Sequence, residues 1–109
     1  MGKLTYRMVM KKQADYFGIE NRMNLAKEEM AELTKELCKA QRIIEGDITC
    51  DEDIIIVKQK ITEEIADVEL VLEELKYLLN NKNRVRQAKK YKIRRTDIRL
   101  REKGINLCQ

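Results

Sequence analysis

Hydrophobic residues recur at alternating intervals of three and four along two long stretches of the chain, which is the spacing of one face of an α-helix. In residues 21–44 this apolar stripe consists of Ala26, Met30, Leu33, Leu37, Ala40 and Ile44. In residues 49–80 it consists of Ile54, Val57, Ile61, Ile65, Val68, Leu72, Leu75 and Leu79. Stripes of this regularity predict two long amphipathic helices that pack against each other, close to antiparallel, along these faces.

Helix-ending residues divide the rest of the chain. Gly18, Gly46 and Gly104 each follow a helical pattern, and glycine readily adopts the left-handed conformation that ends a helix. Residues 49–52 read Thr-Cys-Asp-Glu, which has the spacing of a capping box and predicts the start of a helix. The four predicted helices cover residues 4–17, 21–44, 49–80 and 84–103.

The composition favours an all-α fold. The 109 residues include no proline and only 5% aromatic side chains, a poor supply for a β-sandwich. A hydrophobic content of 43% is too high for a disordered chain. Because a domain of this length buries a small core, we expect a single domain over residues 1–109: a four-helix bundle with two long central antiparallel helices, completed by oligomerisation.

No apolar run is longer than the four residues Ile54–Val57, so we expect no membrane-spanning segment and no association with a membrane. The start of the chain also lacks the apolar core of a signal peptide. The three cysteines are odd in number and show no C-x-x-C spacing, which fits a reducing compartment, and we therefore expect a cytoplasmic protein.

Charge is segregated along the chain. Residues 20–75 carry 16 acidic and 7 basic side chains, whereas residues 76–109 carry 12 basic and 2 acidic ones. An acidic middle suits a bound metal ion and a basic tail suits a polyphosphate, although the two parts could equally neutralise each other across a bundle.

The acids of the middle part form two matching motifs. Residues 28–32 read E-E-x-x-E and residues 63–67 read E-E-x-x-D, one motif on each central helix. The second and last acids of each motif are three residues apart, so they share a helix face and flank the apolar stripe. These four candidate ligands are Glu29, Glu32, Glu64 and Asp67.

Four carboxylates that point toward a neighbouring helix repel one another unless a cation holds them. An all-oxygen set favours a hard ion, Mg²⁺ or Mn²⁺, and the absence of histidine excludes the di-iron sites built from Glu-x-x-His pairs. A single acidic pair on a helix is usually a solvated face, but two matching pairs beside the core favour a metal site. Glu28 and Glu63 are expected at the surface, and Glu36 either joins the cluster or is exposed.

Residues 25–33 and 63–68 resemble the signature of the MazG-type all-α nucleoside triphosphate pyrophosphatases, in which E-E-x-x-E on one helix is paired with E-x-x-D on the next. The resemblance covers roughly residues 20–100. It implies that Glu29, Glu32, Glu64 and Asp67 bind Mg²⁺ and that the protein hydrolyses a (deoxy)nucleoside triphosphate to the monophosphate and pyrophosphate. The resemblance also implies assembly as a homodimer or homotetramer.

The basic tail adds a second resemblance. Residues 91–100 are similar to the K-[LI]-x-R…R-L stretch that follows the acidic helices in small MazG-like proteins. By that resemblance Lys92 and Arg95 are candidate ligands of the substrate phosphates, a role in which cations neutralise the charge that the metal leaves over. Gln13 and Asn24 are weaker candidates for contacts with the base or ribose.

Two other functions stay open. The main alternative is a non-catalytic helical binding module that contacts nucleic acid through the basic helix at residues 84–103. Nucleic acid is the less favoured partner, because a module that only binds it has no need of four acids between two helices. The third interpretation is a regulatory homologue that keeps the fold without turnover, although all four predicted ligands are present.

Overall fold

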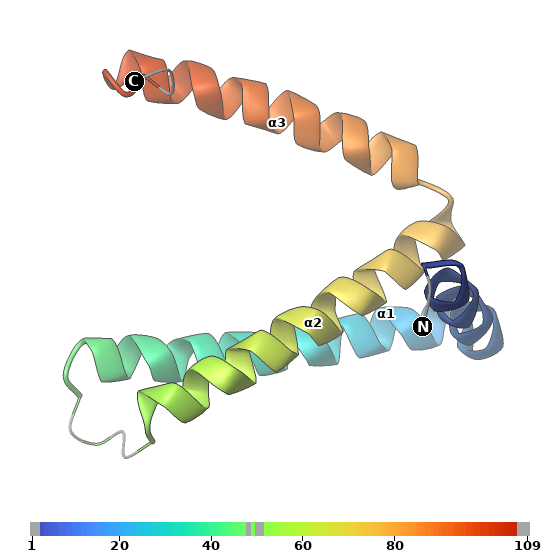
Figure 1. Ribbon diagram of the computed structural model, residues 1–109, viewed down its shortest axis with the longest axis horizontal. Coiled ribbons are helices and arrows are strands. Elements are labelled where there is room, and N and C mark those ends of the chain that lie inside the picture. The colour runs from blue at the N-terminus through green and yellow to red at the C-terminus, as the bar shows by residue number, and fades with distance from the viewer. Residues whose placement is uncertain (1–2, 48, 50–51, 107–109) are drawn as a thin grey trace. The chain divides into compact units, whose positions relative to one another are not determined.

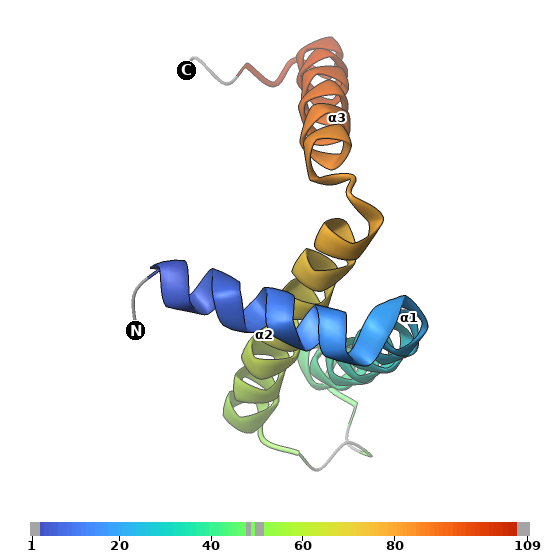
Figure 2. The same cartoon turned by 90° about the vertical axis from the view of Figure 1, so that its right-hand side faces the viewer.

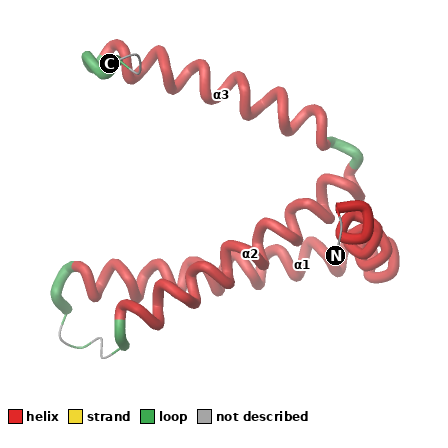
Figure 3. Tube along the Cα trace, in the orientation of Figure 1, coloured by secondary structure: helices red, strands yellow, loops and turns green. Residues whose placement is uncertain are grey.

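The structure, a computed structural model that describes residues 3–47, 49 and 52–106, is helical over nearly all of this part and contains no strand there. It has three helices, α1 (Lys3–Ile44), α2 (Ile54–Leu79) and α3 (Lys82–Glu102), joined by short loops (Figure 3). The prediction of an all-α fold is therefore confirmed. None of these helices is long and apolar enough to cross a membrane.

Helix α1 is broken at Gly18, as the sequence predicts. This residue has φ 82° and ψ 169°, a conformation open in practice only to glycine, so residues 3–17 and 19–44 are two helical segments with different directions (Figure 2). The second segment begins directly after the glycine, two residues earlier than predicted. We call residues 3–17 the N-terminal segment.

The predicted capping box at residues 49–52 is wrong. Helix α2 begins at Ile54, where the Asp53 carboxylate accepts a hydrogen bond of 2.9 Å from the amide N–H of Ile55. The Thr49 hydroxyl instead donates a hydrogen bond to the Asp47 carboxylate, 2.6 Å away in the preceding loop. Aspartate is a strong helix N-cap, which explains why the helix starts later than the earlier Thr-Glu pair suggested.

Residues 19–44 of α1 and helix α2 form an antiparallel pair, seen side by side in Figure 1. Their contact line, which we call the seam, consists of buried or half-buried residues. On α1 these are Arg22, Ala26, Glu29, Leu33, Glu36, Ala40 and Ile43. On α2 they are Val57, Ile61, Glu64, Val68, Val71, Leu75 and Leu78.

The seam corrects the predicted packing face. Both helices are rotated away from the predicted stripes, so Met30, Leu37 and Ile44 are exposed on α1 while the charged Arg22 and Glu36 are 95% buried. Burial of these charges is tolerated because each has an ionic partner: Arg22 pairs with Glu74, and Glu36 with Lys39.

The rotation leaves an exposed apolar surface beside the seam. Its residues recur every seven positions, are 41% to 77% exposed, and each directly follows a seam residue. We call this surface the apolar flank: Met23, Met30, Leu37 and Ile44 on α1, with Ile65, Leu72 and Leu79 on α2. In an antiparallel pair of helices, the positions that directly follow these seam residues lie on the same side of the pair on both helices. The apolar flank is therefore one continuous face.

The N-terminal segment packs against the carboxyl-terminal half of α2. Ala14 is fully buried there, and the hydroxyl of Tyr77 donates hydrogen bonds of 2.9 and 3.0 Å to the two carboxylate oxygens of Asp15. The ammonium group of Lys11 lies 5.6 Å from the centre of the Tyr77 ring, a cation–π contact that ties the segment to the same tyrosine. These contacts hold the segment against α2.

Helix α3 belongs to a separate compact unit, residues 80–109, whereas α1 and α2 form the unit of residues 1–79. Helix α3 carries ten basic and two acidic side chains. It ends as predicted at Gly104, with φ 81°. The amide N–H of Gly104 donates to the carbonyl of Arg101, and that of Ile105 to the carbonyl of Leu100, which is the Schellman pattern.

Candidate metal centre and adjoining pocket

Three carboxylates from the two acidic motifs converge across the seam. Glu29 on α1 meets Glu64 and Asp67 on α2, and one oxygen from each lies within 4.8 Å of the others. The geometry follows from the antiparallel pairing, which places the middle of α1 against the middle of α2. We call these three residues the acidic cluster.

The acidic cluster raises the pKa of Glu29 from 4.5 to about 6. Burial of the carboxyl is the largest cause, followed by a hydrogen bond with Glu64 and the negative charge of Asp67. All three effects disfavour the charged form of Glu29. The Oε2 atom of Glu64 is buried and has no hydrogen-bond partner among the described residues. An oxygen that is both buried and unpartnered in a group of acids is suited to a cation.

The other predicted acids lie outside this cluster. Glu32, three residues after Glu29, is exposed and is not among the three converging carboxylates. Glu28 and Glu63 are exposed, as predicted. Glu36 is neither exposed nor in the cluster, because its Oε1 atom pairs with the Lys39 ammonium at 3.3 Å and the residue is buried further along the seam.

A pocket of about 110 Å³ adjoins the acidic cluster. Glu29 and Asp67 line one part of it, so the cluster and the pocket share a wall. The sides are apolar, and the remaining wall is polar. The apolar residues are Leu25, Leu70 and Val71, and the polar ones are Gln13, Arg22 and Glu74.

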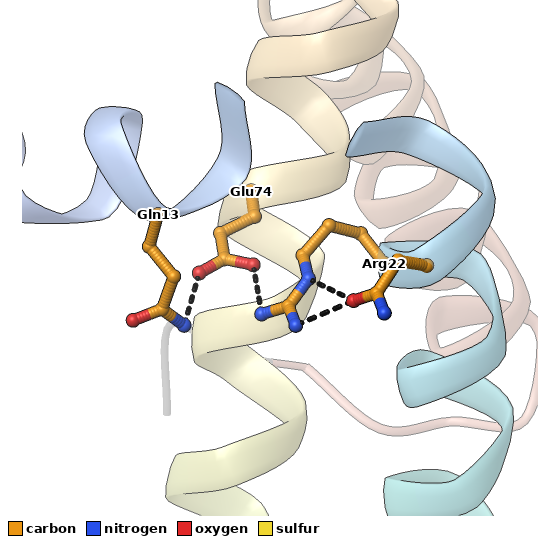
Figure 4. Close-up of polar contacts among 4 residues, drawn as sticks. Gln13, Arg22 and Glu74 are labelled. Atoms are coloured by element: carbon orange, nitrogen blue, oxygen red, sulfur yellow. Dashed lines mark hydrogen bonds and ion pairs between the residues drawn. The ribbon is translucent and has the colours of Figure 1, made fainter. Parts of the chain in front are cut away.

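The polar wall is built around the Glu74 carboxylate, which is contacted from two segments of α1 (Figure 4). The side-chain amide of Gln13 donates to Oε1 at 2.9 Å, and Nη1 of Arg22 donates to Oε2 at 3.0 Å. Arg22 also donates from Nη2 and Nε to the side-chain Oδ1 of Asn21, at 2.7 and 3.1 Å, and its guanidinium carbon lies 4.4 Å from the centre of the Phe17 ring. Both partners of the ion pair are therefore fixed.

Arg22 and Glu74 are not among the functional residues predicted from the sequence. The signal that could have found them is their spacing, because each lies seven residues from a member of the acidic cluster: Arg22 from Glu29, and Glu74 from Asp67. Seven residues are two helical turns, so each pair lies on the same helix face. When two residues of opposite charge each lie two turns from residues that meet across the seam, and in the same direction along the antiparallel pair, an ion pair between them is expected.

Lys92 and Arg95, the predicted phosphate ligands, lie on α3 and are exposed. The guanidinium carbon of Arg95 is 5.8 Å from the centre of the Tyr91 ring, one turn earlier. This contact orients the arginine along the helix surface.

The unit of residues 1–79 thus combines an all-oxygen cluster with an adjoining pocket, and an assignment of function rests on these two features. Comparisons of the chain with protein-family models, with curated proteins and with solved structures find no match.

Proposed function

We propose that this protein is a Mg²⁺-dependent nucleotide pyrophosphohydrolase of the MazG-like type, which cleaves a (deoxy)nucleoside triphosphate to the monophosphate and pyrophosphate. The observation that carries the proposal is the convergence of Glu29, Glu64 and Asp67 within 4.8 Å between two helices, the two glutamates half-buried and Asp67 exposed. Such an arrangement is unfavourable for the protein alone, since Glu64 and Asp67, together with burial, raise the pKa of Glu29. A divalent cation removes that cost.

The donors fit a hard cation. They are all carboxylate oxygens, which Mg²⁺ and Mn²⁺ prefer, and the buried unpartnered oxygen of Glu64 gives the ion a ready ligand. Glu29, Glu64 and Asp67 would hold it, and Glu32, one turn after Glu29, would complete the set by a change of rotamer. Mg²⁺ bound there supplies Lewis-acid chemistry, because it withdraws charge from phosphate oxygens and makes water more acidic.

The side chains of the protein would supply proton transfer and further positive charge. No histidine exists to accept a proton, so one of the carboxylates Glu29, Glu32 and Glu64 orients the attacking water and accepts its proton. The developing charge of the pyrophosphate needs further cations. The exposed Lys92 and Arg95 of α3 are proposed for that role on the family resemblance.

We propose further that the protein is a homo-oligomer assembled through the apolar flank. Within residues 3–47, 49 and 52–106 the buried apolar side chains are few and small. They are Ala14, Ala26, Ala40, Val57 and Val71. A second copy packed on the apolar flank would bury the seven large side chains there and form a four-helix bundle. The acidic cluster and the pocket would remain accessible, since Leu25 and Asp67 directly precede the seam residues Ala26 and Val68 and so lie on the side of the seam opposite the apolar flank.

A turnover assay tests the enzymatic proposal. The purified protein is incubated with ribo- and deoxyribonucleoside triphosphates, with Mg²⁺ or with EDTA, and the monophosphate and pyrophosphate are measured. We expect Mg²⁺-dependent release that Glu64→Gln abolishes and Glu63→Gln, a change at the adjacent exposed residue, leaves intact. If no nucleotide is cleaved and the protein instead binds DNA or RNA in a salt-sensitive manner, the binding module based on α3 is favoured.

A further inference from the structure

The pocket beside the acidic cluster has the position expected of a subsite for the part of a ligand that lies beyond its phosphates. Its polar wall lies two helical turns from the cluster, since Arg22 and Glu74 are each seven residues from Glu29 and Asp67, respectively. Two turns correspond to roughly 10 Å along the helix axes. A nucleotide whose phosphates lie at the acidic cluster can therefore extend into the pocket toward that wall.

The walls of the pocket fit a flat ring with a polar edge. Leu25, Leu70 and Val71 provide apolar surface along the sides. At the polar wall, Gln13 uses its amide N–H₂ to bind Glu74, so its carbonyl oxygen is directed away from the carboxylate (Figure 4). The combination of apolar sides with a few fixed polar groups is typical of small-molecule sites, in which the polar groups select the ligand's edge.

The size of the pocket restricts the ring. An apolar protein cavity of roughly 150 Å³ accommodates benzene. The pocket here has about 110 Å³, less than that cavity, so it covers a larger part of one six-membered ring than of a fused two-ring system, and either ring would reach partly into solvent.

We propose that this pocket receives the base of a pyrimidine nucleotide and rejects purines, with Gln13 and the Arg22–Glu74 ion pair contacting the polar edge of the base. The proposal rests on the nucleotide pyrophosphohydrolase function proposed above and names its substrate class. Gln13 would contact the substrate directly, and the ion pair would provide the polar surface that faces the edge of the base.

The first test compares kcat/KM for CTP, UTP, ATP and GTP and their deoxy forms. The wild type is expected to favour pyrimidines by about tenfold or more. Leu70→Ala enlarges the pocket and should raise kcat/KM for purines several-fold. Ile56→Ala is the matched control, because both residues lie on α2 and are similarly exposed, Leu70 at 41% and Ile56 at 49%, but Ile56 lies neither in the pocket nor on the apolar flank.

The second test concerns Gln13. Gln13→Ala should raise KM for pyrimidine triphosphates about tenfold with little change in kcat, since it removes binding without touching the acidic cluster. Loss of kcat alone would contradict the assigned contact. Equal turnover of purines and pyrimidines, with Leu70→Ala no different from Ile56→Ala, would overturn the pocket proposal while leaving the proposed pyrophosphohydrolase activity standing. If neither turnover nor Mg²⁺-dependent binding of any nucleotide is detected by calorimetry, both proposals are refuted.

Discussion

Replacing Glu29 with glutamine provides a quantitative test of the acidic cluster that needs no substrate. In the metal-free protein the pKa of Glu29 is raised to about 6, chiefly by burial and then by Glu64 and Asp67. The folded protein therefore binds this proton more tightly than the unfolded chain. By linkage, the free energy of unfolding falls as the pH rises through the interval from 4.5 to about 6, and the loss is complete above it.

The size of this effect follows from the shift. An increase from 4.5 to about 6 corresponds to roughly 2 kcal/mol at 1.36 kcal/mol per pKa unit. Glu29 is only half-buried, and solvent screening reduces the expected contribution to about 1 kcal/mol. Glu29→Gln removes the titrating group. The loss of stability between about pH 4 and pH 7.5 should therefore be about 1 kcal/mol smaller in the variant than in the wild type.

Urea denaturation followed by far-UV circular dichroism measures this difference, in EDTA and at one protein concentration. Glu28→Gln is the control, because it removes an equal charge from the adjacent exposed position. Addition of Mg²⁺ at pH 7.5 should stabilise the wild type, by about 2.7 kcal/mol at a hundred times the dissociation constant, and stabilise Glu29→Gln much less. If the two variants show the same pH dependence and the same response to Mg²⁺, the proposed coupling in the cluster is incorrect.

Three further predictions concern the scaffold. Arg22→Met leaves Glu74 buried without its cation and should lower the free energy of unfolding by about 3 kcal/mol, whereas the double change Arg22→Met with Glu74→Leu should recover most of it in urea denaturation. Gly18→Ala meets no atom within 4 Å of the added Cβ, so its cost is backbone strain alone, about 2 kcal/mol, measurable by thermal unfolding. Leu72→Lys should shift the oligomer toward monomer in light scattering, whereas Leu70→Lys, equally exposed but off the apolar flank, should not; equal effects would contradict the proposed interface.

The sequence predicted the helical elements well because their determinants are local. Gly18 and Gly104 end helices through their own backbone conformations, with φ 82° and 81°. The start of α2 was placed too early, since residues 49–52 offered a capping pattern and Asp53 offered a competing N-cap. The choice between two nearby caps depends on the loop geometry, which the spacing of residues does not contain.

The packing face was harder to predict because hydrophobicity alone does not fix the rotation of a helix. The predicted stripe through Met30 and Leu37 is apolar, yet these side chains are exposed and the seam includes Arg22 instead. A charged residue can occupy a seam when its partner arrives from a distant part of the chain, and Glu74 lies 52 positions away. Such a pairing is a property of the folded pair of helices.

The candidate site was predicted in part for the same reason. The spacing of the two acidic motifs correctly identified Glu29, Glu64 and Asp67 as residues on facing sides of two helices. Glu32 was predicted to join them because residues three apart share a helix face. That face is wide enough to include both Glu29, in the seam, and Glu32, which is exposed beside it. The pocket could not be predicted, because it requires the N-terminal segment to bring Gln13 next to Glu74.

The break at Gly18 divides α1 into a part that contributes to the pocket and a part that carries a predicted metal ligand. Residues 19–44 carry Glu29 and form the rigid pair with α2, whereas the N-terminal segment contributes Gln13 to the pocket and nothing to the acidic cluster. Substitutions at surface positions of residues 3–17 can therefore alter the shape and polarity of the pocket while the metal ligands keep their places. We expect ligand preference and catalytic machinery in this scaffold to be independently adjustable, so that a library confined to this segment would yield variants that differ in the base they accept and agree in their requirement for Mg²⁺.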